Sequence, residues 1–298
     1  MDEGDRSIMT AEGIGHRYGR RIALTDVSFA VRRGAVTGLV GANGSGKSTL
    51  LRIMAGVQSA TAGRVRMAGE LLDAHEGAGR GTGAAVDGMS LWPSWTVRRN
   101  LEYVAGLTGS SRDDIHRAAA LVRIEQELPT RLRRLSLGNR QRVALAAAIL
   151  AGTELVLLDE PMNGLDPDTR GVIRDVIVRL SGEGRSVVLS SHDLHDVDAV
   201  CSDLLVLDAG RLTHAGPLAG FDADATVVVV RVAPADADRA RVALAEAGVR
   251  CTREGEGGLV VAAHEVGSAL RVLAQAPVGV LATQDRHATL EEKFHGRI

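Results

Sequence analysis

The chain has 298 residues, of which 45% are hydrophobic and 24% charged, as in an ordinary globular protein. Its 35 Lys and Arg residues against 37 Asp and Glu residues give a formal net charge of −2, which excludes the basic surface of a general nucleic-acid-binding protein. Aromatic residues make up only 2% of the chain, and the two cysteines, Cys201 and Cys251, lie far apart in sequence, so neither a base-stacking platform nor a disulfide scaffold is expected.

The sequence predicts no segment that enters a membrane. Residues 1–6 are acidic rather than apolar, unlike the start of a signal peptide, and no run approaches the roughly 18 consecutive apolar residues of a membrane-spanning helix. We therefore expect a cytoplasmic protein without a nucleic-acid partner, whose contact with a membrane is made through another protein.

Residues 8–35 predict an antiparallel sheet, because apolar Val27, Phe29 and Val31 alternate with other residues as in a half-exposed strand. Four later apolar runs lack alternation and indicate strands buried on both faces of a parallel sheet: Val36–Val40, Leu155–Leu158, Val187–Leu189 and Leu204–Leu207. Helical stretches such as Ser48–Ala55 and Thr169–Leu180 lie between these runs, which indicates an α/β domain.

Two segments interrupt this predicted domain. Residues 73–88 are rich in glycine and polar residues and are predicted to form a loop. Residues from about 92 to 151 are predicted to form a helical insert, in which Asp113–Arg123 and Gln141–Ala151 are the clearest helices.

The composition changes near residues 216–224, and we predict a domain boundary there. The main domain is expected to cover residues 1–218 and a small C-terminal α+β domain residues 219–298. Strands and helices in the second domain follow the order β-α-β-β-α-β: Thr226–Val232, Asp236–Ala247, Val249–Arg253, Leu259–Ala263, Val266–Gln275 and Val278–Ala282. This order is that of a small ferredoxin-like domain.

Residues 41–49 fit the phosphate-binding pattern G-x-x-x-x-G-K-[ST] between a predicted strand and a predicted helix. Glycines let successive backbone N–H groups point inward around phosphate oxygens, and the helix that follows adds its positive end. Lys47 is expected to contact the β- and γ-phosphates, and Ser48 to ligate Mg²⁺. The candidate nucleotide-binding residues are Gly41, Asn43, Gly44, Ser45, Gly46, Lys47, Ser48 and Thr49.

A second acidic motif follows the buried run Leu155–Leu158. Ligands of doubly wound sheets bind beyond the carboxyl ends of the strands, so Asp159 and Glu160 are expected beside the phosphate loop. Asp159 is a candidate Mg²⁺ ligand through the metal's water shell, and Glu160 is placed to activate the attacking water.

The chain resembles the ATPase subunits of ATP-binding-cassette (ABC) transporters. Beyond the two motifs above, five features match the family's motifs in order along residues 8–216: Tyr18, Thr96–Leu101, Leu135–Gln141, Asn163–Asp166 and Ser190–Asp193. The resemblance implies a P-loop NTPase with a RecA-like parallel sheet, an antiparallel β subdomain and the helical insert. It also implies ATP and Mg²⁺ as cofactors.

The resemblance assigns a role to each matched residue. Tyr18 is expected to stack on adenine, and His192 to contact the γ-phosphate and the attacking water. Ser136 and Gly138 lie in the signature motif, and Asp166 in the loop named for its aspartate (the D-loop). In the family, the signature motif closes on the γ-phosphate of the opposite subunit. Catalysis by Lys47, Glu160 and His192 is therefore expected in a dimer with a second copy or a homologous subunit.

Three departures from the family pattern bear on turnover. Asp87 stands where the family has a glutamine if Leu91-Trp92-Pro93 is aligned with the usual loop, and we count it as a candidate metal-site residue. Leu137 and Asn139 replace a glycine and a glutamine of the signature motif. These changes are predicted to slow hydrolysis without abolishing it, because Lys47 and Glu160 are retained.

The sequence gives weaker signals for the membrane partner and for the direction of transport. Trp92 and Trp95 lie before the helical insert and are interpreted either as packing or as part of a groove for a membrane permease. Residues 288–294 resemble an element of ATPases that serve drug and polysaccharide exporters, which favours export of a drug-like or other small molecule by a complex at the inner face of the cell membrane. The alternatives are an importer, an ATP-gated dimerisation module with little turnover, and a cassette ATPase outside transport.

Overall fold

The computed structural model describes residues 7–72, 81–86, 91–221 and 226–287. The chain divides into two compact units, Met1–Phe221 and Asp222–Ile298. In the part of the chain that is described, none of the helices combines the length and the apolarity needed to cross a membrane.

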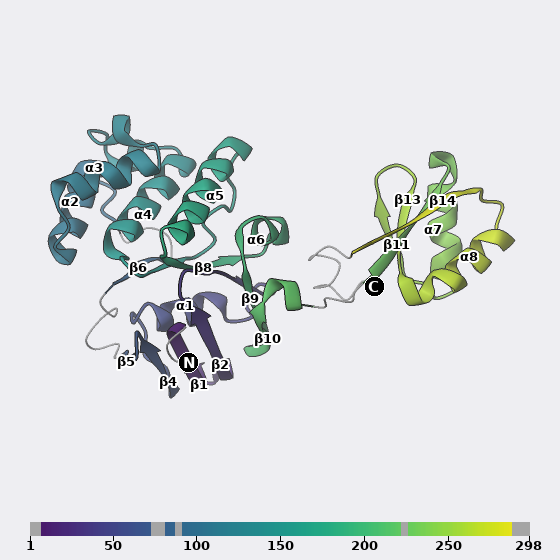
Figure 1. The fold of residues 1–298 in the computed structure, drawn as a ribbon, viewed down its shortest axis with the longest axis horizontal. Helices are drawn as coiled ribbons and strands as arrows, with labels where there is room; N and C mark the ends of the chain where they lie inside the picture. The colour runs from purple at the N-terminus through teal and green to yellow at the C-terminus, as the bar shows by residue number, and fades with distance from the viewer. Residues whose placement is uncertain (1–6, 73–80, 87–90, 222–225, 288–298) are drawn as a thin grey trace. The chain divides into compact units, whose positions relative to one another are not determined.

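The first unit begins with an antiparallel sheet. Its strands lie in the order β2-β1-β4-β5 and comprise β1 (Ser7–Tyr18), β2 (Arg21–Arg32), β4 (Ala62–Met67) and β5 (Glu70–Leu71) (Figure 1). From Val27 onward every second residue of β2, namely Val27, Phe29 and Val31, is buried, and the residues between them are exposed. The alternation read from the sequence is therefore the alternation of buried and exposed faces.

A second sheet forms the centre of the unit, in the order β10-β9-β3-β8-β7-β6. Its strands are β3 (Val36–Val40), β6 (Thr82–Ala85), β7 (Leu155–Leu158), β8 (Ser186–Ser191), β9 (Asp203–Asp208) and β10 (Arg211–Pro217). Neighbouring strands run parallel except β9 and β10. The fold predicted for residues 8–216, a parallel core with an antiparallel subdomain and a helical insert, is confirmed.

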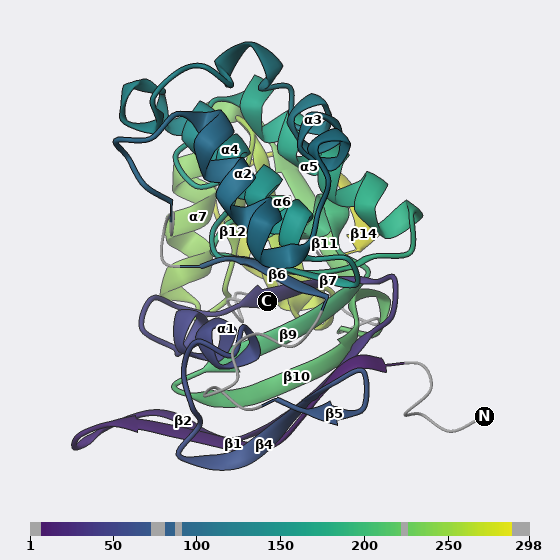
Figure 2. The same cartoon turned by 90° about the vertical axis from the view of Figure 1, so that its left-hand side faces the viewer.

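Both faces of the central sheet are covered, which explains the unbroken apolar runs. Leu155 and Leu157 of β7 pack in a cluster with α1 (Lys47–Met54) and the antiparallel sheet. Val156 and Leu158 of the same strand pack in a second cluster with the helical insert and α5 (Pro167–Gly182). Figure 2 shows α1 on one side of β6 and β7 and helices α2, α4 and α5 on the other.

The predicted loop over residues 73–88 is wrong for residues 82–85, which form the edge strand β6. This strand pairs in parallel with β7. A Cβ on Gly83 would lie 1.9 Å from the carbonyl oxygen of Ala148, so only glycine allows the backbone of α4 to pass this close. The segment Thr82-Gly83-Ala84-Ala85 contains none of the branched apolar residues that identify a strand, and at Gly83 the backbone of α4 occupies the space that a side chain would need.

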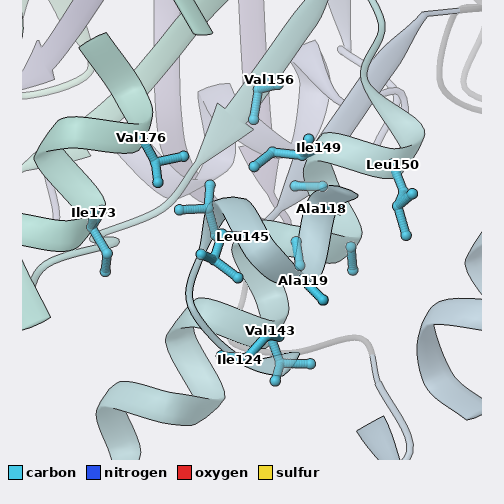
Figure 3. Close-up of a cluster of buried hydrophobic side chains, with 14 of the residues drawn as sticks. Ala118, Ala119, Ile124, Val143, Leu145, Ile149, Leu150, Val156, Ile173 and Val176 are labelled. Atoms are coloured by element: carbon cyan, nitrogen blue, oxygen red, sulfur yellow. The ribbon is translucent and has the colours of Figure 1, made fainter. Parts of the chain in front are cut away.

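The helical insert comprises α2 (Val97–Thr108), α3 (Arg112–Leu121) and α4 (Leu137–Ala151), with short 3₁₀ turns at Glu125–Glu127 and Leu132–Arg134. Each α-helix begins at a side-chain cap: Thr96, Ser111 and Ser136 accept hydrogen bonds from the first turns of α2, α3 and α4. Eight consecutive residues of α4, Val143–Leu150, are buried. Figure 3 shows side chains from α3, α4, β7 and α5 meeting in this core.

After α6 (Leu194–Val200), β9 and β10, a 3₁₀ turn at Leu218–Gly220 ends the first unit. The second unit contains β11 (Thr226–Val232), α7 (Ala237–Glu246), β12 (Thr252–Glu254), β13 (Gly258–Ala262), α8 (Val266–Gln275) and β14 (Val280–His287). Its antiparallel sheet has the order β12-β13-β11-β14, and both helices contribute to one apolar cluster with β11 and β13. The strand predicted at Val278–Ala282 extends to His287, whereas the one predicted at Val249–Arg253 covers only Thr252–Glu254.

Candidate functional site

A cavity of about 590 Å³ lies at the start of α1. The phosphate-loop residues reach it because the chain turns sharply at Gly46, whose φ of 109° is unfavourable for any residue with a Cβ. A Cβ at this position would also lie 2.8 Å from the carbonyl oxygen of Ala23. The cavity is lined by Tyr18, Arg21, Ala23, Asn43, Gly44, Gly46, Lys47, Ser48, Thr49, Arg52, Asp159, Glu160, Asn163 and His192.

Lys47 lines this cavity, and only 8% of the residue is exposed. Its Nζ donates to the carbonyl oxygens of Gly41 at 2.7 Å and Ala42 at 3.3 Å. Burial lowers the pKa of the ammonium group, an effect opposed by the charges of Glu160 and Asp159. The lysine therefore stands in a partly desolvated position where a phosphate would be strongly attracted.

The two carboxylates come from the end of β7 and are held by the neighbouring strand β8. The Ser190 hydroxyl donates to Asp159 Oδ1 at 2.6 Å and accepts from the backbone N–H of Glu160 at 2.8 Å. Glu160 has a φ of 49°, in the left-handed region that an L-residue enters at a cost. The buried serine thus fixes the strained turn that aims both carboxylates at the cavity.

His192 reaches the same cavity from the end of β8. Its Nδ1 lies 2.7 Å from Oε2 of Glu160, and about half of its side chain is exposed. Because β7 and β8 pair in parallel, their carboxyl ends meet at one edge of the sheet, and the acid and the histidine face one another.

Tyr18 ends β1 at the rim of the cavity, with 46% of the residue exposed. Its hydroxyl donates to Gln58 Oε1 at 2.9 Å and accepts from Arg52 at 3.3 Å. The ring packs edge-on against His16, with centroids 4.7 Å apart. These contacts set the orientation of the ring, and nearly half of the residue stays exposed.

The other phosphate-loop residues named from the sequence, Gly41 and Ser45, support the loop rather than line the cavity. The carbonyl of Gly41 accepts from Lys47, and the carbonyl of Ser45 accepts from Gly210 N at 3.0 Å. The donor set suits Mg²⁺, because Ser48 and Asp159 bring hard oxygen ligands to one cavity. Asp87, the third metal candidate, lies outside the described residues.

Ser136, Gly138 and Asp166 form a different surface, because none of the three lines the cavity. Ser136 Oγ accepts from Asn139 N at 3.2 Å and caps α4, while Asp166 Oδ1 accepts from Thr169 N at 2.9 Å and caps α5. A Cβ on Gly138 would lie 3.0 Å from Cγ2 of Thr169. The starts of α4 and α5 therefore pack closely together.

Leu137 and Asn139, the two residues that differ from the family's signature motif, contact different parts of the first unit. Leu137 is 46% exposed, and its Cδ2 lies 3.6 Å from where a Cβ of Gly164 would be, so the side chain lies over the D-loop backbone. Asn139 Nδ2 donates to Glu127 Oε1 at 3.2 Å, and its Oδ1 accepts from Arg142.

Sequence reasoning missed several residues of this site. The sequence singles out Ser190 only as part of the motif Ser190–Asp193, although a serine near the end of an apolar strand is a usable signal when another strand ends in carboxylates. Arg21 and Arg52 gave no signal, because their approach to the cavity depends on how the antiparallel sheet and α1 pack.

Three aromatic residues cluster before and within α2. The rings of Trp92 and Trp95 stack with centroids 4.6 Å apart, and Tyr103 packs edge-on against Trp92 at 4.6 Å. The Arg99 guanidinium lies 4.1 Å from the centroid of the Trp95 ring. Trp92 and Tyr103 remain 39% and 42% exposed, so the cluster is a half-exposed aromatic surface.

A phosphate loop that opens α1, together with the acid pair Asp159 and Glu160 after β7, defines the first unit as a P-loop nucleotide hydrolase. A family model described as ABC transporter matches residues 24–163. Nod factor export ATP-binding protein I of Ralstonia nicotianae is 32% identical over 70% of this chain and 66% of that protein. The uncharacterized ABC transporter ATP-binding protein YdbJ of Bacillus subtilis is 32% identical over 76% of this chain and 75% of that protein.

Solved structures of ABC transporter ATPases are similar to the first unit. One described as the ATP binding subunit of an ABC transporter has a TM-score of 0.67 and 25% identity, covering 73% of this chain and 93% of that one. A bacterial Atm1-family ABC exporter with ATP bound has a TM-score of 0.63 and 27% identity, covering 72% of this chain and 39% of that one. The chain belongs to the ATP-binding subunits of ABC transporters, a family of ATPases.

Proposed function

We propose that the chain hydrolyses Mg-ATP within a dimer of cassettes and thereby drives a separate membrane permease in export. The observation that carries this proposal is that the residues expected to bind one γ-phosphate lie on two separate surfaces of the same chain. Lys47, Glu160 and His192 share one cavity, whereas Ser136 belongs to a separate surface at the start of α4. Each chain offers one complete phosphate loop and one signature surface, so a second chain is needed to complete each site.

In the proposed reaction, the backbone N–H groups of the phosphate loop and Lys47 bind the β- and γ-phosphates, and Tyr18 stacks on the adenine. Ser48 and Asp159 would hold Mg²⁺, which when bound neutralises charge on the phosphates. The Ser136 hydroxyl and the N-terminus of α4 of the second chain contact the γ-phosphate from the other side.

Glu160 acts as the base. Its carboxylate accepts a proton from water, the water oxygen bonds to the γ-phosphorus, and the bond from that phosphorus to the β–γ bridging oxygen breaks to release ADP and phosphate. His192 orients Glu160 through the contact at Nδ1. Its other ring nitrogen, Nε2, would contact the γ-phosphate. The Ser190 hydroxyl keeps both carboxylates in place.

The permease is proposed to contact the half-exposed aromatic surface formed by Trp92, Trp95 and Tyr103. Three of the seven Phe, Trp and Tyr residues of the chain lie there, although aromatics are rare in this protein. Half-buried aromatic groups are typical anchors of protein interfaces. Such a contact would hold the ATPase at the inner face of the cell membrane. Export is favoured over import because curated relatives are named for Nod factor export.

A second candidate function is an ATP-gated dimerisation module with little turnover. One observation favours it: Leu137 is 46% exposed beside Ser136, so its side chain adds bulk to the surface proposed to contact phosphate. Replacing Leu137 by glycine distinguishes the two functions, because only the module is expected to gain turnover.

The shared site is tested by mixing two inactive variants. Lys47→Ala disables the phosphate loop and Ser136→Arg blocks the signature surface, so neither homodimer has an intact site. A mixed dimer contains one intact site, formed by the phosphate loop of the second variant and the signature surface of the first. The mixture should hydrolyse ATP at up to about a quarter of the wild-type rate. A mixture no more active than its separate components would contradict the shared site.

A further inference from the structure

Two arginines of α5 clamp the segment that follows His192. Arg170 Nη1 donates to Asp193 Oδ2 at 2.9 Å and lies 3.7 Å from Asp196 Oδ2. One helical turn later, Arg174 contacts the Asp196 carboxylate through Nε at 3.2 Å and through Nη2. Asp196 is only 1% exposed, whereas the side chains of Arg170, Arg174 and Asp193 are about a third exposed, so this is a partly buried ion-pair network.

Asp193 sits at the centre of the loop that carries His192. Its Oδ1 accepts from His195 N at 3.1 Å and caps α6, and its backbone N–H donates to Ser191 Oγ at 3.0 Å. Burial raises the pKa of Asp193, but hydrogen bonds from Arg170 and His195 outweigh it and hold that pKa below its ordinary value. The carboxylate is therefore ionised when Arg170 binds it.

Arg170 also lies one turn inside the helix that begins at the D-loop. Asp166 caps this helix, and Thr169, adjacent to Arg170, packs against Gly138 of the signature motif. The start of α5 thus contacts the signature surface on one side and the His192 loop on the other.

We propose that Arg170 is a positioning residue for ATP hydrolysis: through Asp193 it holds His192 in register with Glu160. This inference rests on the proposed function of Glu160 and His192. Arg170 itself lines no part of the nucleotide cavity. Its loss should therefore change the rate of the chemical step and leave nucleotide binding intact, since a shift of about 1 Å in a reacting group costs up to 100-fold.

The test compares Arg170→Met with Arg170→Lys and Asp193→Asn. The matched control is Arg179→Met on the same helix, whose partner Glu183 lies in an exposed i,i+4 pair. Steady-state ATPase rates, the affinity for a fluorescent ATP analogue and the melting temperature are measured for all four variants and the wild type.

We expect Arg170→Met to lower kcat about tenfold with KM and nucleotide affinity within twofold of the wild type. Arg170→Lys should recover part of the loss because it restores a charge opposite Asp193. Asp193→Asn, which keeps a capping oxygen, should also lower kcat, and Arg179→Met should not.

Wild-type kcat in Arg170→Met would overturn the inference while leaving the proposed function intact. A parallel loss of kcat, affinity and melting temperature in both Arg170→Met and Asp193→Asn would also overturn it, since that pattern is a general folding defect. If Arg170→Met does not fold, Asp193→Asn decides by the same kcat and affinity criteria. A wild-type protein that hydrolyses no faster than Glu160→Gln would instead contradict the proposed function.

Discussion

His192 Nδ1 lies 2.7 Å from Oε2 of Glu160, although the two residues are 32 positions apart. The contact exists because each residue follows one of two adjacent parallel strands, β7 and β8. It links Glu160, the proposed base, directly to His192, the residue proposed to contact the γ-phosphate.

Replacing His192 by alanine should therefore leave Glu160, the proposed base, poorly oriented. We expect ATP hydrolysis to fall at least about 100-fold with nucleotide affinity largely retained, because Lys47 and Tyr18 are unchanged. Steady-state phosphate release and nucleotide titration measure the two quantities. Activity within threefold of the wild type would remove His192 from the reaction.

Ser190 should matter more for catalysis than an ordinary buried serine. Ser190→Ala removes the hydroxyl that binds Asp159 and leaves the Glu160 N–H without its partner, at a cost of about 1–3 kcal/mol. We expect both the melting temperature and kcat to fall. The control is Ser186→Ala on the same strand, where the hydroxyl accepts from Gly34 N. It should lower the melting temperature alone, and equal kcat losses in both variants would refute the role of Ser190.

Leu137→Gly tests whether the signature departure suppresses turnover. The sequence predicts that this departure slows hydrolysis, but the Leu137 side chain lies over the D-loop at Gly164. We therefore expect the turnover of Leu137→Gly to stay within about threefold of the wild type, under 1 kcal/mol in barrier height. Phosphate-release assays on Leu137→Gly and the wild type measure the two turnover rates. An increase of tenfold or more would favour the dimerisation module instead.

Gly83→Ala should destabilise the first unit by about 1–3 kcal/mol or prevent folding, because the added Cβ would overlap the Ala148 carbonyl of α4. Gly106→Ala in α2 is the control, since a Cβ there meets no atom within 4 Å and alanine favours a helix. Denaturant unfolding gives both free energies. A Gly83→Ala protein as stable as Gly106→Ala would contradict the close packing of β6 and α4.

The sequence predicts those parts of the site that depend on local patterns. The phosphate loop and the acid pair could be named because their residue types and spacing follow from the chemistry of binding phosphate, and the apolar runs located β3 and β7. The strand β6 could not be predicted, because it lacks the branched apolar residues typical of a strand and the backbone of α4 leaves room only for glycine at Gly83.

Contacts between segments that lie far apart in the sequence could not be predicted from it either. The hydrogen bond from Tyr18 to Gln58 and the clamp of Arg170 on Asp193 join elements whose relative positions follow only from packing. Each residue taken alone is an ordinary polar side chain. The sequence therefore named the groups proposed to perform chemistry better than the groups that hold them in place.

The central claim is that two chains enclose ATP between them. It is tested most directly by measuring the mass of Glu160→Gln in solution by light scattering, with and without saturating Mg-ATP. This variant should retain binding and lose hydrolysis, so the account predicts one chain without nucleotide and two chains with it. A mass of one chain at saturating Mg-ATP would contradict the account.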